Sequence, residues 1–312
     1  MVDKELLYGT LKKYFGYDSF REGQEELITN TLQGKDVLGI MPTSGGKSLC
    51  YQLPALLLDG MTIVVSPLVS LMKDQVDSLR EMGIAAAYLN STLSREEFLQ
   101  LMDDMRSGQL KLLYIAPERI DNESFMNALR FVNVPLLVVD EAHCISQWGS
   151  DFRPSYQGVA RLYDVFGRRP RVAAFTATAT EPVQDDIMIQ LRLQQPFRLV
   201  TGFDRSNLAF SVEKPADKFK FLVKDLNPKE ASIIYCSTRK NVESVQKKLE
   251  QKGFAVTLYH AGLPEHERQR NQDDFLFDRK PIMVATNAFG MGIDKSNVRT
   301  VYHYNMPKNI ES

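Results

Sequence analysis

The sequence contains few of the features that mark secreted, zinc-binding or membrane proteins. Its three cysteines, Cys50, Cys144 and Cys236, lie far apart without a Cys-x-x-Cys spacing, so neither a disulfide framework nor a zinc site is indicated. No apolar run approaches the roughly 20 residues that span a bilayer, and residues 1–5 show no charged-then-apolar signal pattern. We expect a soluble intracellular protein without zinc or a membrane partner. We expect it to be cytoplasmic, or associated with the nucleoid if the protein is bacterial.

An excess of charge of one sign is also missing. Lys and Arg total 38 against 39 Asp and Glu, which leaves a net charge of −1. Net charge therefore gives no support for nucleic-acid binding, and any basic surface must be local. The chain has 312 residues, of which 44% are hydrophobic and 25% charged. This composition suits two domains of ordinary size, each with its own core.

Short apolar runs alternate with helix-length amphipathic stretches in the first two thirds of the chain. Continuous β-branched runs are typical of buried parallel strands, and the stretches between them are typical of crossover helices. The predicted helices include 68–80 and 95–106, and the predicted strands are 37–40, 62–66, 112–116, 136–139 and 172–175. The pattern predicts a first α/β domain over residues 1–203, followed by a short linker near 201–207.

The alternation starts again after the linker. The predicted strands are 208–212, 232–236, 256–259, 282–285 and 300–304. The clearest helix begins near Ser237 or Thr238, both suitable N-caps, and ends at Gly253. Its buried stripe is predicted to comprise Val242, Val245 and Leu249. Residues 204–312 are therefore predicted to form a second domain with a mainly parallel sheet.

A glycine-rich turn follows the first predicted strand, in the run Gly39-Ile-Met-Pro-Thr-Ser-Gly-Gly-Lys47-Ser48. Such a turn between a strand and a helix directs backbone N–H groups at phosphate. Lys47 would neutralise the β- and γ-phosphates and Ser48 would bind Mg²⁺. Met41 replaces the first glycine of the usual pattern. The run alone permits an ordinary helix cap as the alternative.

Two acidic residues follow the predicted strand 136–139, in the run Asp140-Glu141-Ala-His143. The carboxyl ends of parallel strands share one edge of a sheet, where open α/β folds bind ligands. Asp140 would hold the metal and Glu141 would act as the general base toward water. A solvated turn is the alternative for either residue alone. Together with Lys47, the pair predicts a nucleoside triphosphatase that uses ATP and Mg²⁺.

The order of these and further motifs resembles the RecQ family of DNA helicases over essentially the whole chain. The resemblance implies two tandem RecA-like domains, each a mainly parallel sheet flanked by helices, with the second incomplete. It also implies an ATP-dependent 3′–5′ helicase that acts on single-stranded and partially duplex DNA. The matching runs are Phe20-Arg21-Glu-Gly-Gln24, Met41-Pro-Thr-Ser-Gly-Gly-Lys-Ser48, Val65-Ser-Pro-Leu-Val-Ser-Leu-Met-Lys-Asp-Gln75, Asp140-Glu-Ala-His-Cys-Ile-Ser-Gln-Trp148, Phe175-Thr-Ala-Thr-Ala-Thr180 and Asn287-Ala-Phe-Gly-Met-Gly-Ile-Asp294.

The resemblance places an adenine site before the glycine-rich turn. Gln24 would pair with the edge of the base, while Tyr17 and Arg21 would flank its ring, since a planar guanidinium stacks well on a purine. Outside this motif, Tyr17 reads as a core aromatic and Arg21 as a surface charge. The phosphates would be bound by Thr43, Ser44, Gly45, Gly46, Lys47 and Ser48.

The resemblance also implies a DNA contact and a coupling path. The segment after His143, residues 145–154, carries the single tryptophan of the chain and is called the aromatic segment below. Exposed aromatic side chains on such a segment stack on nucleobases. The DNA-binding residues would be Trp148, Phe152, Arg153, Ser237, Thr238 and Arg239, and the coupling residues would be Thr176, Thr178, Gly290 and Asp294. The alternatives are a core tryptophan, and helix caps for the serines and threonines.

The sequence departs from the family pattern in three places. Ser44 stands where glycine is usual, which costs roughly 1 kcal/mol or more if that position needs a positive φ. Ser150 replaces a usual histidine, which affects the coupling of DNA to hydrolysis. The chain ends at Ser312, before the motif that supplies arginine fingers. Because such arginines contribute about 10³–10⁵ in rate, we expect this chain to bind nucleotide but to turn it over poorly.

Two other functions stay open at this point. The first is a nucleotide-gated DNA-binding or annealing fragment without efficient turnover, which the missing arginine fingers favour. The second is an RNA helicase of the DEAD/DEAH type, which the aromatic segment after His143 disfavours. Restoring a longer C-terminus would separate the motor from the fragment, because only the motor is expected to gain unwinding.

Overall fold

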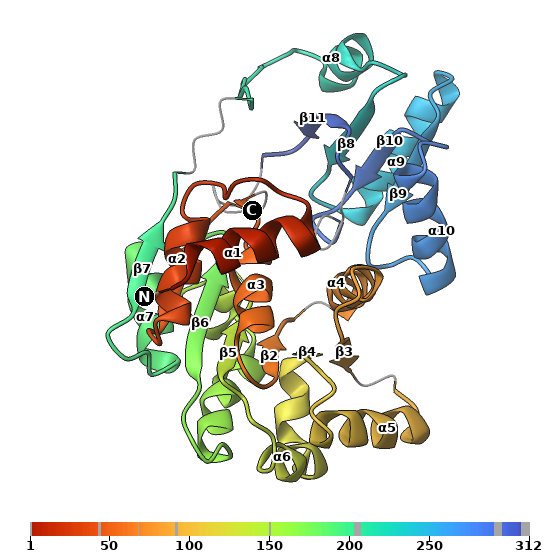
Figure 1. The fold of residues 1–312 in the computed structure, drawn as a ribbon. Helices are drawn as coiled ribbons and strands as arrows, with labels where there is room; N and C mark the ends of the chain where they lie inside the picture. The colour runs from red at the N-terminus through yellow and green to blue at the C-terminus, as the bar shows by residue number, and fades with distance from the viewer. Residues whose placement is uncertain are drawn as a thin grey trace. The chain divides into compact units, whose positions relative to one another are not determined.

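The chain forms two compact units, Met1–Arg205 and Ser206–Ser312 (Figure 1). The structure, a computed structural model, describes residues 2–42, 45–67, 69–90, 93–149, 151–202, 207–289 and 295–306. The predicted domain boundary after residue 203 lies outside these described residues. Within the described ranges, no helix has the length and apolar composition needed to cross a bilayer.

The first unit is built on a seven-stranded sheet in which every strand pair is parallel. The strand order is β3-β4-β2-β5-β6-β1-β7. The central strands are buried on both faces, as their continuous apolar runs predict. The strands are β1 (Val37–Ile40), β2 (Thr62–Val65), β3 (Ala86–Leu89), β4 (Leu112–Ile115), β5 (Leu136–Val139), β6 (Arg171–Thr176) and β7 (Phe197–Val200).

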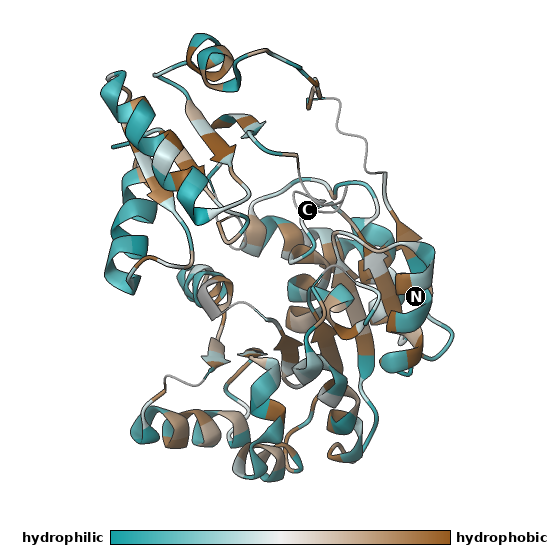
Figure 2. Cartoon of the chain, turned by 180° about the vertical axis from the view of Figure 1, so that it is seen from behind, coloured by the Kyte–Doolittle hydropathy of each residue, from teal (hydrophilic) through white to brown (hydrophobic). Residues whose placement is uncertain are grey.

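Helices cover both faces of this sheet and bury its apolar side chains in two clusters. Figure 2 shows the mainly hydrophobic strands between helices that carry hydrophilic residues. One face packs against α1 (Lys4–Thr10), α2 (Gln24–Leu32), α3 (Leu49–Leu57) and α4 (Val69–Glu81). The other packs against α5 (Arg95–Arg106), α6 (Glu123–Leu129), α7 (Glu181–Gln190) and the 3₁₀ segments η4 (Ala142–Ile145) and η5 (Pro154–Asp164).

A buried carboxylate fixes the start of β1 against its neighbour β6. Asp36 is only 3% exposed, and its two oxygens accept hydrogen bonds from Arg169 Nη1 and Nη2 at 3.1 and 2.8 Å. They also accept from the backbone N–H groups of Val172 and Gln194, at 2.8 and 2.7 Å. A buried charge is tolerated when it is paired and fully hydrogen-bonded. Asp36 therefore holds β1 in register beside β6.

The second unit contains a four-stranded parallel sheet in the order β11-β8-β10-β9. Its strands are β8 (Ala231–Tyr235), β9 (Val256–Tyr259), β10 (Ile282–Ala285) and β11 (Val298–His303). One face packs against α8 (Lys218–Asp225) and α9 (Arg239–Gln251), and the other against α10 (Glu265–Leu276). Two parallel sheets flanked by helices confirm the predicted fold class.

The predicted helix near Ser237 is α9, and its cap and buried stripe are as expected. Thr238 is the N-cap, because its Oγ1 accepts a hydrogen bond from the Asn241 N–H at 3.2 Å. Gly253, just past the helix end, has φ 84°, a backbone conformation that favours glycine. The predicted stripe is buried and comprises Val242, Val245 and Leu249.

The structure corrects one strand prediction and adds two strands that the sequence analysis missed. The predicted strand at residues 208–212 is wrong, because these residues form no strand. Leu208, Phe210 and Val212 are exposed by 47%, 94% and 77%. Alternating apolar residues describe a strand only when a neighbouring strand pairs with them, and no described strand pairs with this segment. Conversely, β3 and β7 were not predicted. The Ala-Ala start of β3 lacks β-branched residues, and β7 is an edge strand with exposed Arg198.

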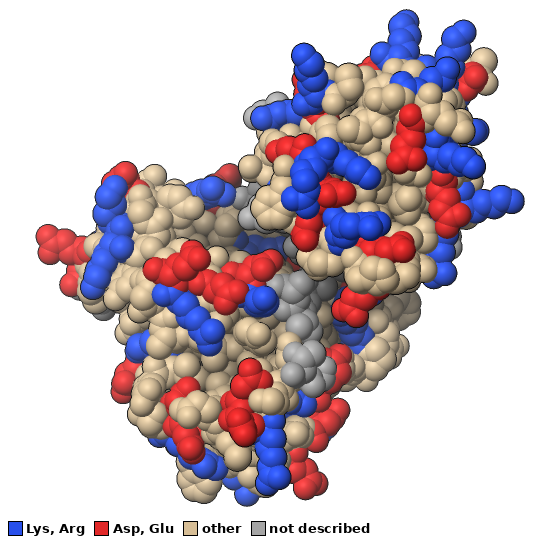
Figure 3. Space-filling model, turned by 90° about the vertical axis from the view of Figure 1, so that its right-hand side faces the viewer, with Lys and Arg blue, Asp and Glu red and all other residues tan. Residues whose placement is uncertain are grey.

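Charged side chains of both signs are interspersed on the face of the molecule that Figure 3 draws. On the face drawn in Figure 3, lysines and arginines alternate with aspartates and glutamates over both units. This distribution matches the net charge of −1. Long-range electrostatic attraction of nucleic acid to the protein is therefore expected to be weak, and contacts with nucleic acid have to be local.

Candidate active site

The ends of three neighbouring strands bring the predicted motifs together. Strands β5, β6 and β1 are adjacent in the sheet, and Ile40 is paired with Thr176 in the register of β1 and β6. The Met41 N–H donates to the Thr176 carbonyl at 3.0 Å, so the glycine-rich turn leaves β1 directly beside the end of β6. Asp140 follows β5 at the same carboxyl edge, where open α/β folds bind ligands.

The glycine-rich turn is held by a buried glutamine. Gln24 is 2% exposed, and its Nε2 donates to the carbonyls of Gly45 and Gly46 at 3.2 and 3.1 Å. Gly46 has φ 73°, and a Cβ added there would lie 2.5 Å from Gln24 Nε2. Both observations require glycine at this position. α3 begins two residues after Lys47, and the N–H groups of Leu49 and Cys50 donate to the carbonyls of Gly46 and Lys47 at 3.2 and 3.0 Å, so the turn leads directly into the helix.

Lys47 is a buried cation with no hydrogen-bond partner among the described residues. Its Nζ lies 3.9 Å from Glu141 Oε1, and the residue is 8% exposed. Buried charged groups are normally paired and hydrogen-bonded, because leaving them without partners is costly. Phosphate oxygens would supply the missing acceptors. The side chain therefore fits a triphosphate group bound in the turn.

Asp140 and Glu141 place two carboxylates beside this lysine. Burial, and next the charge of Glu141, raise the pKa of Asp140 to about 6, while Lys47 and a hydrogen bond from the Glu141 N–H lower it. A buried carboxylate with this pKa gains from a nearby divalent cation, and hard oxygen ligands suit Mg²⁺. Glu141 has φ 47° and ψ 47°, a left-handed conformation that is uncommon outside glycine and clusters at functional sites.

His143 connects these carboxylates to the end of β6, a role that sequence analysis did not assign. Its Nδ1 lies 2.8 Å from Thr176 Oγ1 and 3.4 Å from Glu141 Oε2. The Thr176 hydroxyl donates to the Thr178 carbonyl at 3.2 Å and accepts from the Thr178 N–H at 3.3 Å. Burial lowers the pKa of His143, which favours the neutral imidazole. The two predicted coupling threonines thus contact the acidic motif through one histidine.

Replacing Thr176 with valine should destabilise the first unit by about 1–3 kcal/mol, the usual cost of leaving a buried polar partner unsatisfied. The change removes the oxygen that faces His143 Nδ1 and keeps the size of the side chain. Urea unfolding would measure the loss. Thr176→Ser is the matched control because it keeps the hydroxyl. Equal stabilities for the valine and serine variants would contradict the predicted role of this hydrogen bond.

Tyr156 also supports the acidic motif from a position that no sequence signal indicated. It is fully buried in η5, and its hydroxyl donates to the backbone carbonyl of Asp140 at 3.0 Å. This bond fixes the backbone at the residue that follows β5. A tyrosine 16 residues away carries no motif spacing, so only the folded chain reveals the contact.

Two of the three predicted adenine residues, Arg21 and Gln24, lie beside the glycine-rich turn. Tyr17 is 53% exposed, which excludes the alternative of a core aromatic. A Cβ added at Gly46 would lie 3.9 Å from Arg21 Nη1, so this guanidinium is close to the turn. The Gln24 amide is bonded within the protein, since its Oε1 accepts from the Arg21 N–H at 2.8 Å. Recognition of adenine by these residues stays a prediction.

The aromatic segment exposes the only tryptophan of the chain. Trp148 is 78% exposed, which excludes the alternative of a core tryptophan. Phe152 is half-buried. Arg153 holds the segment in place, since its Nε and Nη2 donate to Asp151 Oδ2 at 3.1 and 2.9 Å and its Nη1 donates to the Pro67 carbonyl at 3.1 Å. Contact of these three residues with DNA stays a prediction.

In the second unit, the predicted DNA-binding residues lie together at the start of α9. Ser237, Thr238 and Arg239 are exposed. Thr238 is the N-cap of α9, in agreement with the helix-cap alternative given in the sequence analysis. The Arg239 guanidinium lies against Gly262, where an added Cβ would be 2.9 Å from Nη1. The predicted positions that lie outside the described residues are Thr43, Ser44, Ser150, Gly290 and Asp294.

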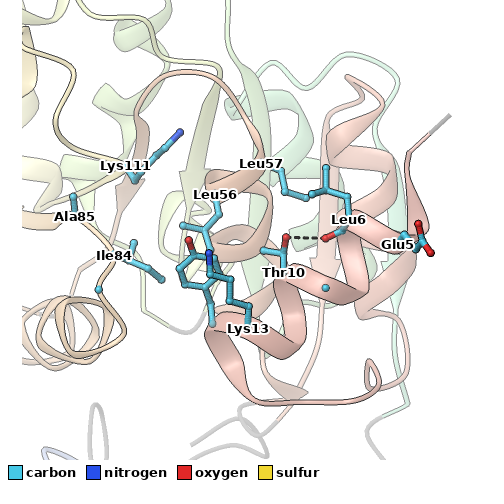
Figure 4. A pocket seen from close by; sticks show the side chains of 12 residues that line it. Glu5, Leu6, Thr10, Lys13, Leu56, Leu57, Ile84, Ala85 and Lys111 are labelled. Carbon is cyan, nitrogen blue, oxygen red and sulfur yellow. Dashed lines mark hydrogen bonds between the residues drawn. The ribbon is translucent and has the colours of Figure 1, made fainter.

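A hollow of about 590 Å³ lies at the opposite edge of the first sheet. Figure 4 shows it between α1 and the end of α3 on one side and the residues before β3 and β4 on the other. The side chains of Lys13 and Lys111 line it together with Leu56 and Leu57. Because these elements precede the strands, the hollow is separate from the site at the carboxyl ends.

Comparison with known proteins identifies two helicase domains. The DEAD/DEAH box helicase family matches residues 21–186, and the helicase conserved C-terminal domain matches residues 217–312. The ATP-dependent DNA helicase RecQ of Bacillus subtilis is 48% identical over 305 residues, which cover 97% of this chain and 52% of that protein. The RecQ of Haemophilus influenzae is 46% identical over 315 residues, 100% of this chain and 51% of that protein. The chain thus spans about half the length of these curated relatives.

Solved structures share the fold at low sequence identity. The DUF1998 helicase MrfA bound to DNA superposes with a TM-score of 0.76 at 18% identity, covering 98% of this chain and 47% of that one. S. cerevisiae Dbp5, bound to RNA and ADP BeF3, gives 0.71 at 19% identity, covering 98% and 79%. The chain belongs to the DEAD/DEAH box helicase family, and its resemblance to RecQ DNA helicases is confirmed over nearly its whole length.

Proposed function

We propose that this chain is the ATP-dependent motor of a 3′–5′ DNA helicase of the RecQ type. One observation carries the proposal. Lys47 is buried beside Glu141, with no hydrogen-bond partner among the described residues, next to a turn that requires glycine. This arrangement suits phosphate oxygens better than any protein group nearby. The curated relatives are named ATP-dependent DNA helicases, which supports the same reading.

The roles of the site residues follow from their positions. ATP with Mg²⁺ would supply the phosphoryl group that is transferred to water. Lys47 places its charge beside the turn, where it would offset the negative charge of the β- and γ-phosphates. Ser48 and Asp140 offer the hydroxyl and carboxylate oxygens that would hold Mg²⁺. Glu141 would accept a proton from the attacking water, and its position is set by the Asp140 carboxylate, which accepts from the Glu141 N–H, and by His143.

DNA would act on this site through the aromatic segment. Trp148 offers an exposed ring five residues after His143, and His143 contacts both Glu141 and Thr176. A nucleobase stacked on Trp148 would therefore be connected to Glu141, the proposed general base, through one short segment of the chain. The hydrogen bonds of Arg153 to Asp151 and to the Pro67 carbonyl would keep that segment in a fixed position.

Trp148→Ala should weaken binding of single-stranded DNA by roughly 5- to 150-fold, because base stacking contributes about 1–3 kcal/mol per base. Fluorescence anisotropy of a labelled oligonucleotide measures the affinity. The matched control is Phe131→Ala, since Phe131 is 82% exposed in the same unit but precedes β5, whereas Trp148 follows it. Equal losses of affinity in the two variants would contradict a specific DNA contact at Trp148.

Single-turnover ATP hydrolysis, with and without single-stranded DNA, tests the proposed function as a whole. We expect single-stranded DNA to increase the rate of ATP hydrolysis. We also expect DNA to displace RNA of equal length from the binding site. Preferential binding of RNA would favour an RNA helicase of the same family, although the RecQ relatives at 46–48% identity support DNA. DNA binding that depends on ATP but never stimulates hydrolysis would favour the nucleotide-gated binding fragment.

A further inference from the structure

Three side chains of different chemistry converge beside the acidic motif. His143 and Cys144 lie in η4, and Asp151 lies in the segment beyond Trp148. Cys144 Sγ is 3.8 Å from His143 Nε2 and 3.9 Å from Asp151 Oδ2, and all three ligand atoms lie within 4.8 Å of one another. Tetrahedral zinc with ligand bonds of about 2.0–2.3 Å separates its ligand atoms by roughly 3.5 Å. Small side-chain movements would thus suffice to enclose an ion.

The histidine is oriented to offer Nε2 as a ligand. His143 Nδ1 lies 2.8 Å from Thr176 Oγ1. When the Thr176 hydroxyl donates to the Thr178 carbonyl, at 3.2 Å, its oxygen accepts the proton of Nδ1. A neutral imidazole with its proton on Nδ1 carries a lone pair on Nε2, the atom that faces Cys144. A hydrogen bond to the non-ligating nitrogen is typical of metal-bound histidines.

The carboxylate of Asp151 is also held in position by hydrogen bonds from a neighbouring side chain. Asp151 Oδ2 accepts two hydrogen bonds from Arg153, at 3.1 and 2.9 Å. Both bonds fall on Oδ2, while an ionised carboxylate has about four acceptor positions over its two oxygens. An ion can therefore bind at Oδ1, or at Oδ2 in place of one Arg153 bond. Arg153 is held in turn by the Pro67 carbonyl at 3.1 Å. Two of the three ligands therefore already have the outer hydrogen bonds that metal sites use.

We propose that His143, Cys144 and Asp151 bind a thiophilic divalent ion such as Zn²⁺, with water as the fourth ligand. A neutral imidazole, a thiolate and a carboxylate would balance its charge. Sulfur and imidazole ligands select zinc or cobalt over magnesium, so this site is distinct from the magnesium position at Asp140 and Ser48. Burial raises the pKa of the Cys144 thiol to about 12, so the ion must displace a proton, which limits its affinity.

An ion at this site would join the acidic motif to the aromatic segment. Its ligands lie on both sides of Trp148, so coordination would close the segment between Cys144 and Asp151 onto η4. This predicts a change in the surroundings of Trp148 when the ion binds. If the proposed helicase function is also correct, the ion would restrain the segment that meets DNA and would inhibit DNA-stimulated hydrolysis.

The test uses the whole chain without nucleotide or DNA, so its outcome is independent of the proposed function. Titration with Zn²⁺ should change the fluorescence of Trp148, the single tryptophan, in a saturable way that millimolar Mg²⁺ does not reproduce. Co²⁺ should give the absorption of a cobalt–thiolate bond. Cys144→Ser and Asp151→Asn should each weaken Zn²⁺ binding at least tenfold, and Cys144→Ser should abolish the cobalt–thiolate band.

Cys236→Ser is the matched control, because Cys236 is also buried but belongs to the second unit and is not a member of the cluster. It should leave both signals unchanged. Circular dichroism would confirm that the variants are folded, and Asp151 is exposed enough for Asp151→Asn to leave the core intact. A cobalt–thiolate band that survives Cys144→Ser, or a Zn²⁺ titration that leaves Trp148 unchanged in the unaltered chain, would overturn the proposal.

Discussion

Lys47→Ala should lower the single-turnover rate of ATP hydrolysis by about 10²–10³-fold, the usual cost of removing one electrostatic stabiliser of a developing negative charge. ATP binding should weaken as well, because Lys47 is the buried cation of the turn and has no hydrogen-bond partner among the described residues. Its removal would leave Asp140 and Glu141 without the positive charge that opposes their repulsion. Rapid mixing of enzyme in excess over radiolabelled ATP would measure the rate.

The matched control is Lys12→Ala. Lys12 is exposed and pairs with Asp18 at the surface of the same unit, so its loss should change neither ATP affinity nor the rate by more than about twofold, as surface ion pairs contribute little. If Lys47→Ala behaved like Lys12→Ala, the glycine-rich turn would not be the phosphate site.

Glu141→Gln should separate catalysis from binding. The substitution preserves the shape of the side chain but removes the basic carboxylate, and loss of a general base typically costs about 10²–10⁴-fold in rate. ATP affinity should stay close to that of the unaltered chain, because Lys47 and the turn are intact. Measuring single-turnover rate and nucleotide affinity on the same preparation distinguishes the two effects.

Glu123→Gln is a suitable control because Glu123 is an exposed residue at the start of α6. It should leave rate and affinity unchanged. A Glu141→Gln variant that hydrolysed ATP at the normal rate would exclude Glu141 as the base. A variant that lost ATP affinity as severely as Lys47→Ala would instead indicate that Glu141 acts mainly by positioning Lys47, 3.9 Å away.

Strands were predictable where both faces are buried. The bounds of β1, β5 and β10 agree with the apolar runs, because a strand covered on both faces needs apolar residues at every position. β3 starts with two alanines and β7 lies at the sheet edge, so neither carries that signal. Residues 208–212 carry an alternating signal without a paired strand, since sequence periodicity does not specify the partner strand.

The site was predictable where chemistry depends on short motifs, and unpredictable where it depends on long-range packing. Lys47 follows β1, while Asp140 and Glu141 follow β5, and the sheet order places these two strands on either side of β6. In contrast, the contact of His143 with Thr176 spans 33 residues, and that of Tyr156 with the Asp140 carbonyl spans 16. Such hydrogen bonds arise from the register of β5 and β6 and from the path of η5, which no local pattern encodes.

The same limit explains why the cysteine count gave no sign of a metal site. A Cys-x-x-Cys spacing reports ligands that are close in sequence, whereas the cluster at Cys144 combines adjacent His143 with Asp151 from within the aromatic segment. Cysteine, histidine and aspartate are each common residues, and only the folded segment brings one ligand atom of each within 4.8 Å. The expectation of a chain without zinc rested on spacing alone.

Isothermal titration calorimetry with a non-hydrolysable ATP analogue and Mg²⁺ tests the central claim most directly, because it measures binding at the turn before Lys47 without requiring turnover. The account predicts saturable heat from one site per chain, abolished or strongly weakened by Lys47→Ala and retained by Lys12→Ala. The absence of any binding heat at millimolar analogue, or equal heat from the Lys47→Ala variant, would contradict it.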